Sequence, residues 1–163
     1  MNTVFQVADY FLNEAFKLEE DFLLDKNFEP ELLCDSKLHL LVYYAQGFHL
    51  ARFDQPLFDE PLEAWGGGPG SPSIYNVGSK YKINPNREKP RPDFDSSVFS
   101  TEQAELLDEI YVKYGQFSLW KLRRLSCRTA PWQNSTPFRN KGRGLVIPHE
   151  EIKEYFKTQL TEK

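Results

Sequence analysis

The sequence has few cysteines and no long apolar run. Its two cysteines, Cys34 and Cys127, lie far apart in a chain of 163 residues, and neither belongs to a pair with metal-binding spacing. We therefore expect two reduced thiols, with neither a disulfide framework nor a structural zinc site. No apolar stretch approaches the about 20 residues that cross a bilayer. The first residues also lack the basic and apolar regions of a secretory signal, so the sequence predicts a cytoplasmic protein without a membrane anchor.

Acidic residues are missing from one part of the chain. Residues 111–147 contain eight Lys or Arg and no Asp or Glu, whereas residues 1–65 contain thirteen Asp or Glu and four Lys or Arg. The whole chain is acidic, with a net charge of −4. A cationic stretch of this kind packs beside the acidic half, forms a solvated face, or contacts nucleic acid.

The nucleic-acid reading has arguments on both sides. Trp120 and Trp132 alternate with cations, the combination that stacks on bases and neutralises phosphates, and the candidate contacts are Arg123, Arg124 and Arg128. Against it, Trp120 follows the core spacing of the neighbouring leucines, and the pI of about 5.5 is low for a nucleic-acid-binding protein.

Residues that carry catalysis are also scarce. The helix that holds His39 and His49 places them roughly 15 Å apart, too far to share a metal ion. The glycines at 66–70 have no following lysine, so they predict a turn and not a phosphate-binding loop. Arg123 and Arg124 could lower the pKa of Cys127, but the sequence places no base beside it. We therefore expect no catalytic residue, no cofactor and no metal site, and hence no enzyme.

What the sequence has in abundance is aromatic residues, at 15% of the chain, in patterns that predict helices. We expect a first helix capped by Asn2 or Thr3, then a buried central helix over 37–53. A third helix is expected after the cap Ser100, and a fourth after the cap Ser118, with Pro131-Trp132 ending it. The last expected helix begins at Pro148. Gly47 inside the central helix predicts close approach of another backbone.

The remaining segments predict little regular structure. Residues 17–33 predict a loop or a short loose helix. Residues 57–65 predict an extended piece, and Pro61 indicates that this strand lies at an edge or is bulged. A Gly/Pro-rich loop follows over 66–72, with Ser73 as the cap of a short helix. Residues 78–97 and 133–144 predict surface loops. The fold class is mainly α: one compact helical domain over 1–163 with a minor short β element.

Several of these segments together resemble a known family. They include Val7 to Leu12, Tyr43-Tyr44-Ala45-Gln46-Gly47, Leu62-Glu63-Ala64-Trp65 followed by Gly68-Pro69, Tyr114-Gly115 and Pro131-Trp132. In this combination the chain resembles the Panacea domain family of SocA-like antitoxins, also known as phage-associated proteins. The chain departs from the family pattern at Gly66-Gly67, Gly70-Ser71, Leu40 and Cys127, and the glycine changes fall in the loop after Trp65.

The resemblance implies a protein-binding module of a toxin–antitoxin system. Such domains neutralise a cognate toxin, often encoded next door, by direct contact, and one similar protein delivers its toxin to a Clp-type protease. On this reading Asp59, Glu60 and Glu63 would steer a basic toxin, and Trp65 and Tyr75 would anchor it. Core packing is the alternative role for both aromatic residues. The runner-up function remains a nucleic-acid-binding regulator that uses the basic 111–147 segment.

Overall fold

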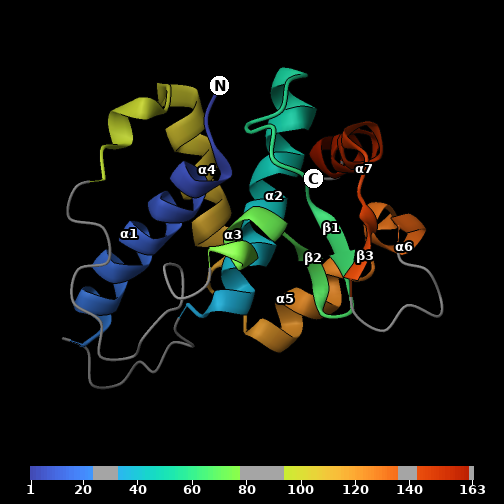
Figure 1. The fold of residues 1–163 in the computed structure, drawn as a ribbon. Coiled ribbons are helices and arrows are strands. Elements are labelled where there is room, and N and C mark those ends of the chain that lie inside the picture. The colour runs from blue at the N-terminus through green and yellow to red at the C-terminus, as the bar shows by residue number, and fades with distance from the viewer. Residues whose placement is uncertain (24–32, 78–93, 136–142, 162–163) are drawn as a thin grey trace.

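The structure, a computed structural model, describes residues 1–23, 33–77, 94–135 and 143–161. The central helix lies between α1 and α4 on one side and the sheet with the last three helices on the other (Figure 1). In chain order, the elements are α1 (Val4–Leu23), α2 (Asp35–Phe53), β1 (Glu63–Trp65), β2 (Gly68–Gly70), α3 (Pro72–Asn76), η2 (Ser96–Val98), α4 (Thr101–Tyr114), α5 (Leu119–Ser126), α6 (Ala130–Ser135), β3 (Arg143–Val146) and α7 (His149–Thr161). The predicted class, mainly α with a minor β element, is confirmed.

The first helix begins at one of its two predicted caps but ends later than expected, and the second begins two residues earlier but ends at Phe53 as predicted. Thr3 caps α1, because its Oγ1 accepts from the Gln6 N–H at 3.2 Å while the Gln6 side chain accepts from the Thr3 N–H at 2.9 Å. The helix continues to Leu23, so of the two alternatives for 17–33 the first part is helical, as a continuation of α1 and not as a separate short helix, and 24–32 lie outside the described residues. Helix α2 begins at Asp35 after Cys34, with no side-chain cap at its start.

Helices α4 and α5 begin where the sequence predicts, each directly after its capping serine. Ser100 and Gln103 form the predicted capping box of α4, and Ser118 caps α5 by accepting from the Lys121 N–H. Pro131 does not stop α5, which ends at Ser126. It lies instead at the start of the separate helix α6. A proline fits there because the first turn of a helix has N–H groups without intrahelical partners.

Parts of the two predicted surface loops, 78–97 and 133–144, belong to helices and a strand. Residues 133–135 end α6 and 143–144 begin β3, while 136–142 lie outside the described residues. Of the predicted loop at 78–97, residues 78–93 also lie outside them, and residues 96–97 belong to the short helix η2. The short helix α3 is capped by Ser71 and not by Ser73.

The sheet corrects two predictions. Its strand order is β2-β1-β3 with antiparallel pairing, so β1 is the middle strand and not an edge strand. The alternative, a bulged strand, agrees with the irregular register between Glu63 and Trp65 in the pairing with β3. Pro61 lies before the strand begins, so its missing N–H removes no hydrogen bond from the sheet. The predicted loop at 66–72 contains β2, which a tight turn at Gly66 and Gly67 joins to β1. This hairpin positions the groove described below.

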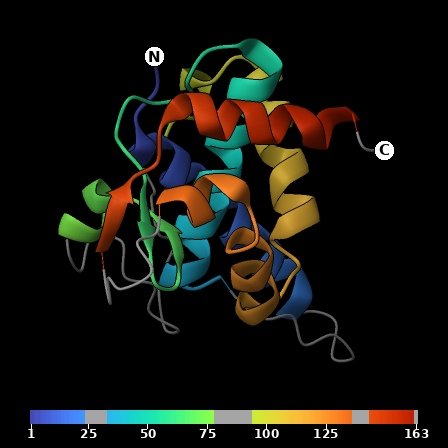
Figure 2. The same ribbon diagram turned by 90° about the vertical axis from the view of Figure 1, so that its right-hand side faces the viewer.

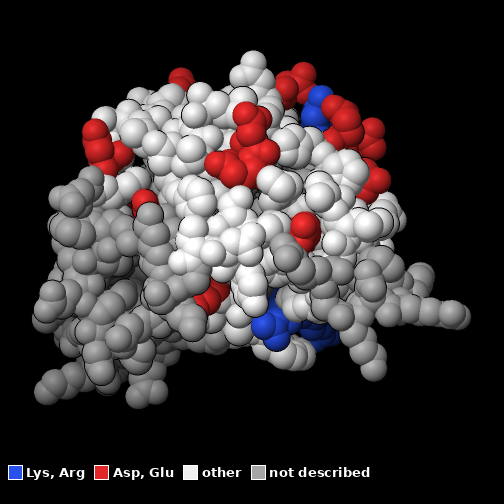
Figure 3. All heavy atoms as spheres, in the orientation of Figure 1, with Lys and Arg blue, Asp and Glu red and all other residues white. Residues whose placement is uncertain are grey.

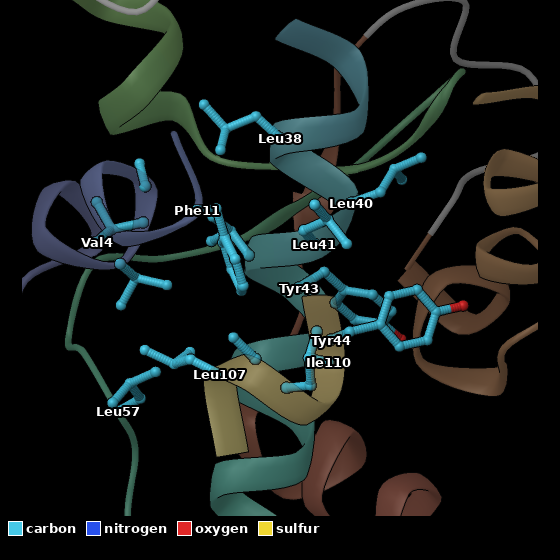
Figure 4. Close-up of a cluster of buried hydrophobic side chains, with 14 of the residues drawn as sticks. Val4, Phe11, Leu38, Leu40, Leu41, Tyr43, Tyr44, Leu57, Leu107 and Ile110 are labelled. Atoms are coloured by element: carbon cyan, nitrogen blue, oxygen red, sulfur yellow. The ribbon is translucent and has the colours of Figure 1, made fainter. Parts of the chain in front are cut away.

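The core surrounds α2, which is buried from Lys37 to Ala51 apart from His39. Figure 4 shows side chains of α1, α2 and α4 meeting there. Helix α7 crosses α2 (Figure 2), and the Phe156 ring occupies the place where a β-carbon at Gly47 would stand. The predicted close approach at Gly47 is therefore real, but a side chain makes it and not a backbone. No helix among the described residues is long and apolar enough to span a membrane.

Buried polar side chains attach the next segment to this core. Gln46 is fully buried; its Oε1 accepts from the Leu57 N–H at 2.7 Å and its Nε2 donates to the Phe58 carbonyl at 2.8 Å. The side chain thereby pairs with the backbone as a neighbouring strand would. Buried Lys37 likewise donates to the carbonyl of Gly115 at 2.9 Å. Through Gln46, α2 fixes the segment that leads into β1.

Candidate binding groove

Trp65, at the end of β1, is held from several directions. Its indole N–H donates to Glu63 Oε1 at 2.9 Å, and its carbonyl accepts from the indole N–H of Trp132 at 2.8 Å. Its ring lies against Gly70, where a β-carbon would overlap it. The indole is half-buried and fixed in orientation by the fold itself. A partner that contacts it therefore loses little affinity to ordering this side chain.

His39 lies beside this ring. Its ring centroid is 5.2 Å from that of Trp65, and its Nδ1 accepts from the Ser71 N–H at 3.0 Å. Burial lowers the pKa of His39 to about 4, although the nearby carboxylate of Asp35 acts in the opposite direction. The imidazole is therefore neutral at pH 7. Because Nδ1 is the acceptor, Nε2 carries the proton and is a hydrogen-bond donor.

Tyr75 and Arg123 form the more open parts of the same region. Tyr75, on α3, is 65% exposed, and its ring meets Trp65 edge-on with centroids 5.8 Å apart. Arg123, on α5, reaches across the hairpin turn, with Nε 3.5 Å from the position a β-carbon of Gly67 would take. Within the described part of the chain, the Arg123 guanidinium makes no hydrogen bond or ion pair, although the Arg123 carbonyl accepts from the Cys127 N–H.

These side chains line one groove of about 520 Å³. Its walls come from the start of α2, the β1–β2 hairpin, α3 and α5, and are mostly apolar or aromatic. A cavity of this size is in the range of about 300 to 1,000 Å³ that is usual for ligand pockets. We call it the groove; its lining is Asp35, Ser36, Leu38, His39, Leu40, Trp65, Gly67, Gly68, Pro69, Ile74, Tyr75 and Arg123.

A family comparison identifies the domain. Residues 38–133 match the family described as antitoxin SocA-like, Panacea domain. The chain belongs to this family. The matched span contains every residue of the groove except Asp35 and Ser36. Searches of curated proteins and of solved structures found no match.

The Panacea domain brings together residues that the sequence had assigned to two different functions. The expected protein-binding residues Trp65 and Tyr75 and the expected nucleic-acid contact Arg123 line the same groove. Core packing, the alternative for Tyr75, does not hold at 65% exposure, whereas Trp65 is partly packed and partly accessible. Glu63 lies at the edge of this arrangement through its bond to the Trp65 indole.

The other two predicted acidic residues lie apart from the groove. Glu60 accepts from the backbone N–H of Val4 at 3.2 Å, at the start of α1. A carboxylate at a helix N-terminus stabilises the helix, which gives Glu60 a structural role. Asp59 is exposed and does not line the groove. Steering of a toxin by these two carboxylates stays a prediction.

The two remaining predicted nucleic-acid contacts, Arg124 and Arg128, are exposed and do not line the groove. Trp120 corrects the sequence argument against nucleic acid, because it is 67% exposed and does not belong to the core. The core spacing of α5 is satisfied by buried Leu122 and half-buried Leu119, one on each side of the exposed pair Trp120 and Lys121.

The chemistry of the groove favours binding. Burial raises the pKa of the Cys127 thiol, while Arg123 only partly opposes this, so the thiol is not activated as a nucleophile. The described residues contain no group of three or more His, Cys, Asp or Glu placed to hold a metal ion. The groove offers instead a cation, a neutral imidazole donor and two aromatic faces.

Sequence reasoning missed His39 and Asp35 as groove residues. The sequence raises His39 only as a catalytic or metal-binding candidate, because nothing in its spacing connects it with Ser71, 32 residues along the chain. The available signal was that the helix that carries His39 and the hairpin that carries Trp65 both belong to the family signature. The packing of α2 against β2 then brings His39 to the same place.

Proposed function

We propose that this Panacea domain neutralises a cognate protein toxin by direct contact at the groove, acting by binding and not by catalysis. The observation that carries the proposal is the position of Trp65, Tyr75 and Arg123 around one groove inside the family-matched span. Trp, Tyr and Arg are the residue types most enriched among binding hot spots. The toxin is expected to be encoded nearby, and the contact to take place in the cytoplasm.

The geometry explains how such a contact would gain affinity. Trp65 is already fixed by Glu63, Trp132 and Gly70, so a toxin side chain entering the groove meets a rigid apolar wall. Tyr75 at the rim would close over that side chain, and Arg123 would bind an acceptor or carboxylate beside it. The Nε2 donor of His39, for which the described residues supply no acceptor, would add a second polar contact in the groove.

The test is growth rescue by co-expression with the products of the adjacent reading frames. The native domain should rescue growth from one of them, and Tyr75→Ala should weaken the isolated complex by about 30-fold, the loss of one hot spot. Val112→Ala is the matched control, because Val112 is 71% exposed on α4 and lies outside the groove. The proposal fails if no neighbouring product is rescued, or if Tyr75→Ala rescues and binds as well as the native domain.

The toxin level in the rescued cells separates two modes of neutralisation. If contact alone neutralises the toxin, its amount stays constant while growth recovers. If the domain delivers the toxin to a Clp-type protease, the amount falls, and rescue is lost in a strain without that protease. Contact at the groove is required in both modes, so the Tyr75→Ala result tests the groove in either case.

A further inference from the structure

The exposed side of α5 is both cationic and aromatic. We call it the outer face of α5, made up of Trp120, Lys121 and Arg124 on the helix and Arg128 just after it; all four residues are exposed. Residues three or four apart share one side of a helix, so Trp120 and Arg124 are neighbours there. The outer face lies inside the family-matched span but outside the groove, and the proposed function does not use it.

Two aromatic rings on this side each lie close to a cationic side chain. The Arg124 guanidinium lies over the Trp120 ring, 5.0 Å from its centroid, and Lys121 Nζ lies 4.1 Å from the centroid of Phe117. Since Trp120 remains 67% exposed, Arg124 leaves most of the indole accessible. An accessible indole beside a guanidinium offers a stacking surface next to a phosphate-binding group.

Charge favours nucleic acid over a protein as the ligand of this face. No Asp or Glu occurs between residues 111 and 147, so no carboxylate of the segment itself competes for these cations. Figure 3 shows most blue basic atoms at the bottom of the view, where Figure 1 places α5 and the hairpin tip, and a further blue group among the red acidic atoms at the upper right. Most red atoms lie higher in the view than the lower blue group. Protein–protein interfaces combine positive and negative charges and contain few Lys residues at their centres. A phosphate backbone, in contrast, is bound by cations.

We propose that the outer face of α5 binds single-stranded nucleic acid, with a base stacked on Trp120 and backbone phosphates on Lys121, Arg124 and Arg128. The ligand is single-stranded because stacking on an exposed side chain needs an unpaired base. The acidic remainder of the molecule repels phosphate and confines the ligand to this short face. Weak binding without strong sequence preference is therefore expected.

The test is fluorescence polarisation of a labelled single-stranded oligonucleotide of about 12 nucleotides with the full chain, titrated at several salt concentrations. Three phosphate contacts predict a slope of about −2 in log affinity against log salt, or about 20-fold weaker binding between about 50 and 200 mM salt. Trp120→Ala should weaken binding about tenfold, because the stacked base loses its platform. Arg124→Ala should also reduce the salt slope by about 0.7.

Lys17→Ala is the charge-matched control, since Lys17 is an exposed lysine on α1, and it should change neither affinity nor slope. Thermal unfolding of each variant checks that it is folded, and removal of exposed side chains should leave the melting temperature unchanged. The proposal is overturned by no polarisation change at low salt, or by binding that Trp120→Ala leaves intact. It is also overturned if polyglutamate displaces the oligonucleotide as well as an unlabelled oligonucleotide does, because the face would then be a general anion-binding surface.

Discussion

Two sides of α5 carry arginines in adjacent positions, yet the two arginines lie in different surroundings. Arg123 extends over the hairpin turn into a groove with apolar and aromatic walls, whereas Arg124 lies on the open outer face against Trp120. A cation in a shaped groove can select one side chain of a protein partner. A cation on an open surface without carboxylates can contact the phosphates of a nucleic-acid backbone, but it discriminates weakly between ligands. The two surfaces therefore differ more in shape than in charge.

The largest expected effect comes from closing the groove while leaving the outer face intact. In Gly70→Ala the new β-carbon overlaps the Trp65 ring, so the indole must move. We expect a stability loss of about 1 to 3 kcal/mol, as for other overpacked sites. Toxin binding should fall at least about tenfold, since a hot-spot contact is displaced. Calorimetry of the toxin complex and thermal melts measure the two effects.

Gly66→Ala is the matched control in the same hairpin, because a β-carbon at Gly66 meets nothing within 4 Å. It should leave toxin binding and oligonucleotide binding unchanged. If Gly70→Ala weakens oligonucleotide binding as much as toxin binding, the two surfaces are not independent and the comparison fails.

A smaller effect is expected from pH, which acts on stability through His39 in the groove and His49 outside it. His39 has a folded-state pKa of about 4 against its usual 6.5, so between these values the unfolded chain binds more protons than the folded one. Stability should therefore fall as the pH drops below about 6.5, by up to about 2 kcal/mol at pH 5 from His39. Burial also lowers the pKa of His49, which adds a loss in the same direction.

Denaturant unfolding at pH 7 and pH 5 measures this loss. His39→Asn keeps an acceptor for the Ser71 N–H but does not titrate, so it should show a smaller difference between the two pH values than the native chain. Oligonucleotide binding should not weaken over this range, because Lys and Arg remain charged. An unchanged pH dependence in His39→Asn would show that His39 is not the source.

The helices could be predicted from the sequence because their signals are local. The capping box of Ser100 and Gln103, the cap at Ser118 and the apolar periodicity of α2 each depend on residues within a few positions. The sheet could not be predicted in the same way. The pairing of β1 with β3 joins Glu63 to Val146, and a proline near one strand says nothing about such a distant partner.

The groove was predictable only in part, for the same reason. Trp65 and Tyr75 belong to the family signature, which drew attention to them before their positions were known. Arg123 meets them only through the packing of α5 against β2. Trp120 was assigned to the core from its neighbours, but a helix of eight residues cannot bury every apolar position, and here Leu122 takes the buried one.

The measurement that tests the account most directly compares Arg123→Ala with Arg124→Ala against both ligands. Arg123→Ala should weaken toxin binding about tenfold. It should change oligonucleotide binding by less than about twofold near physiological salt, where charges separated by more than about 8 Å are screened. Arg124→Ala should show the opposite pattern. If both substitutions weaken both ligands to the same extent, α5 has a single binding surface, and the account is contradicted.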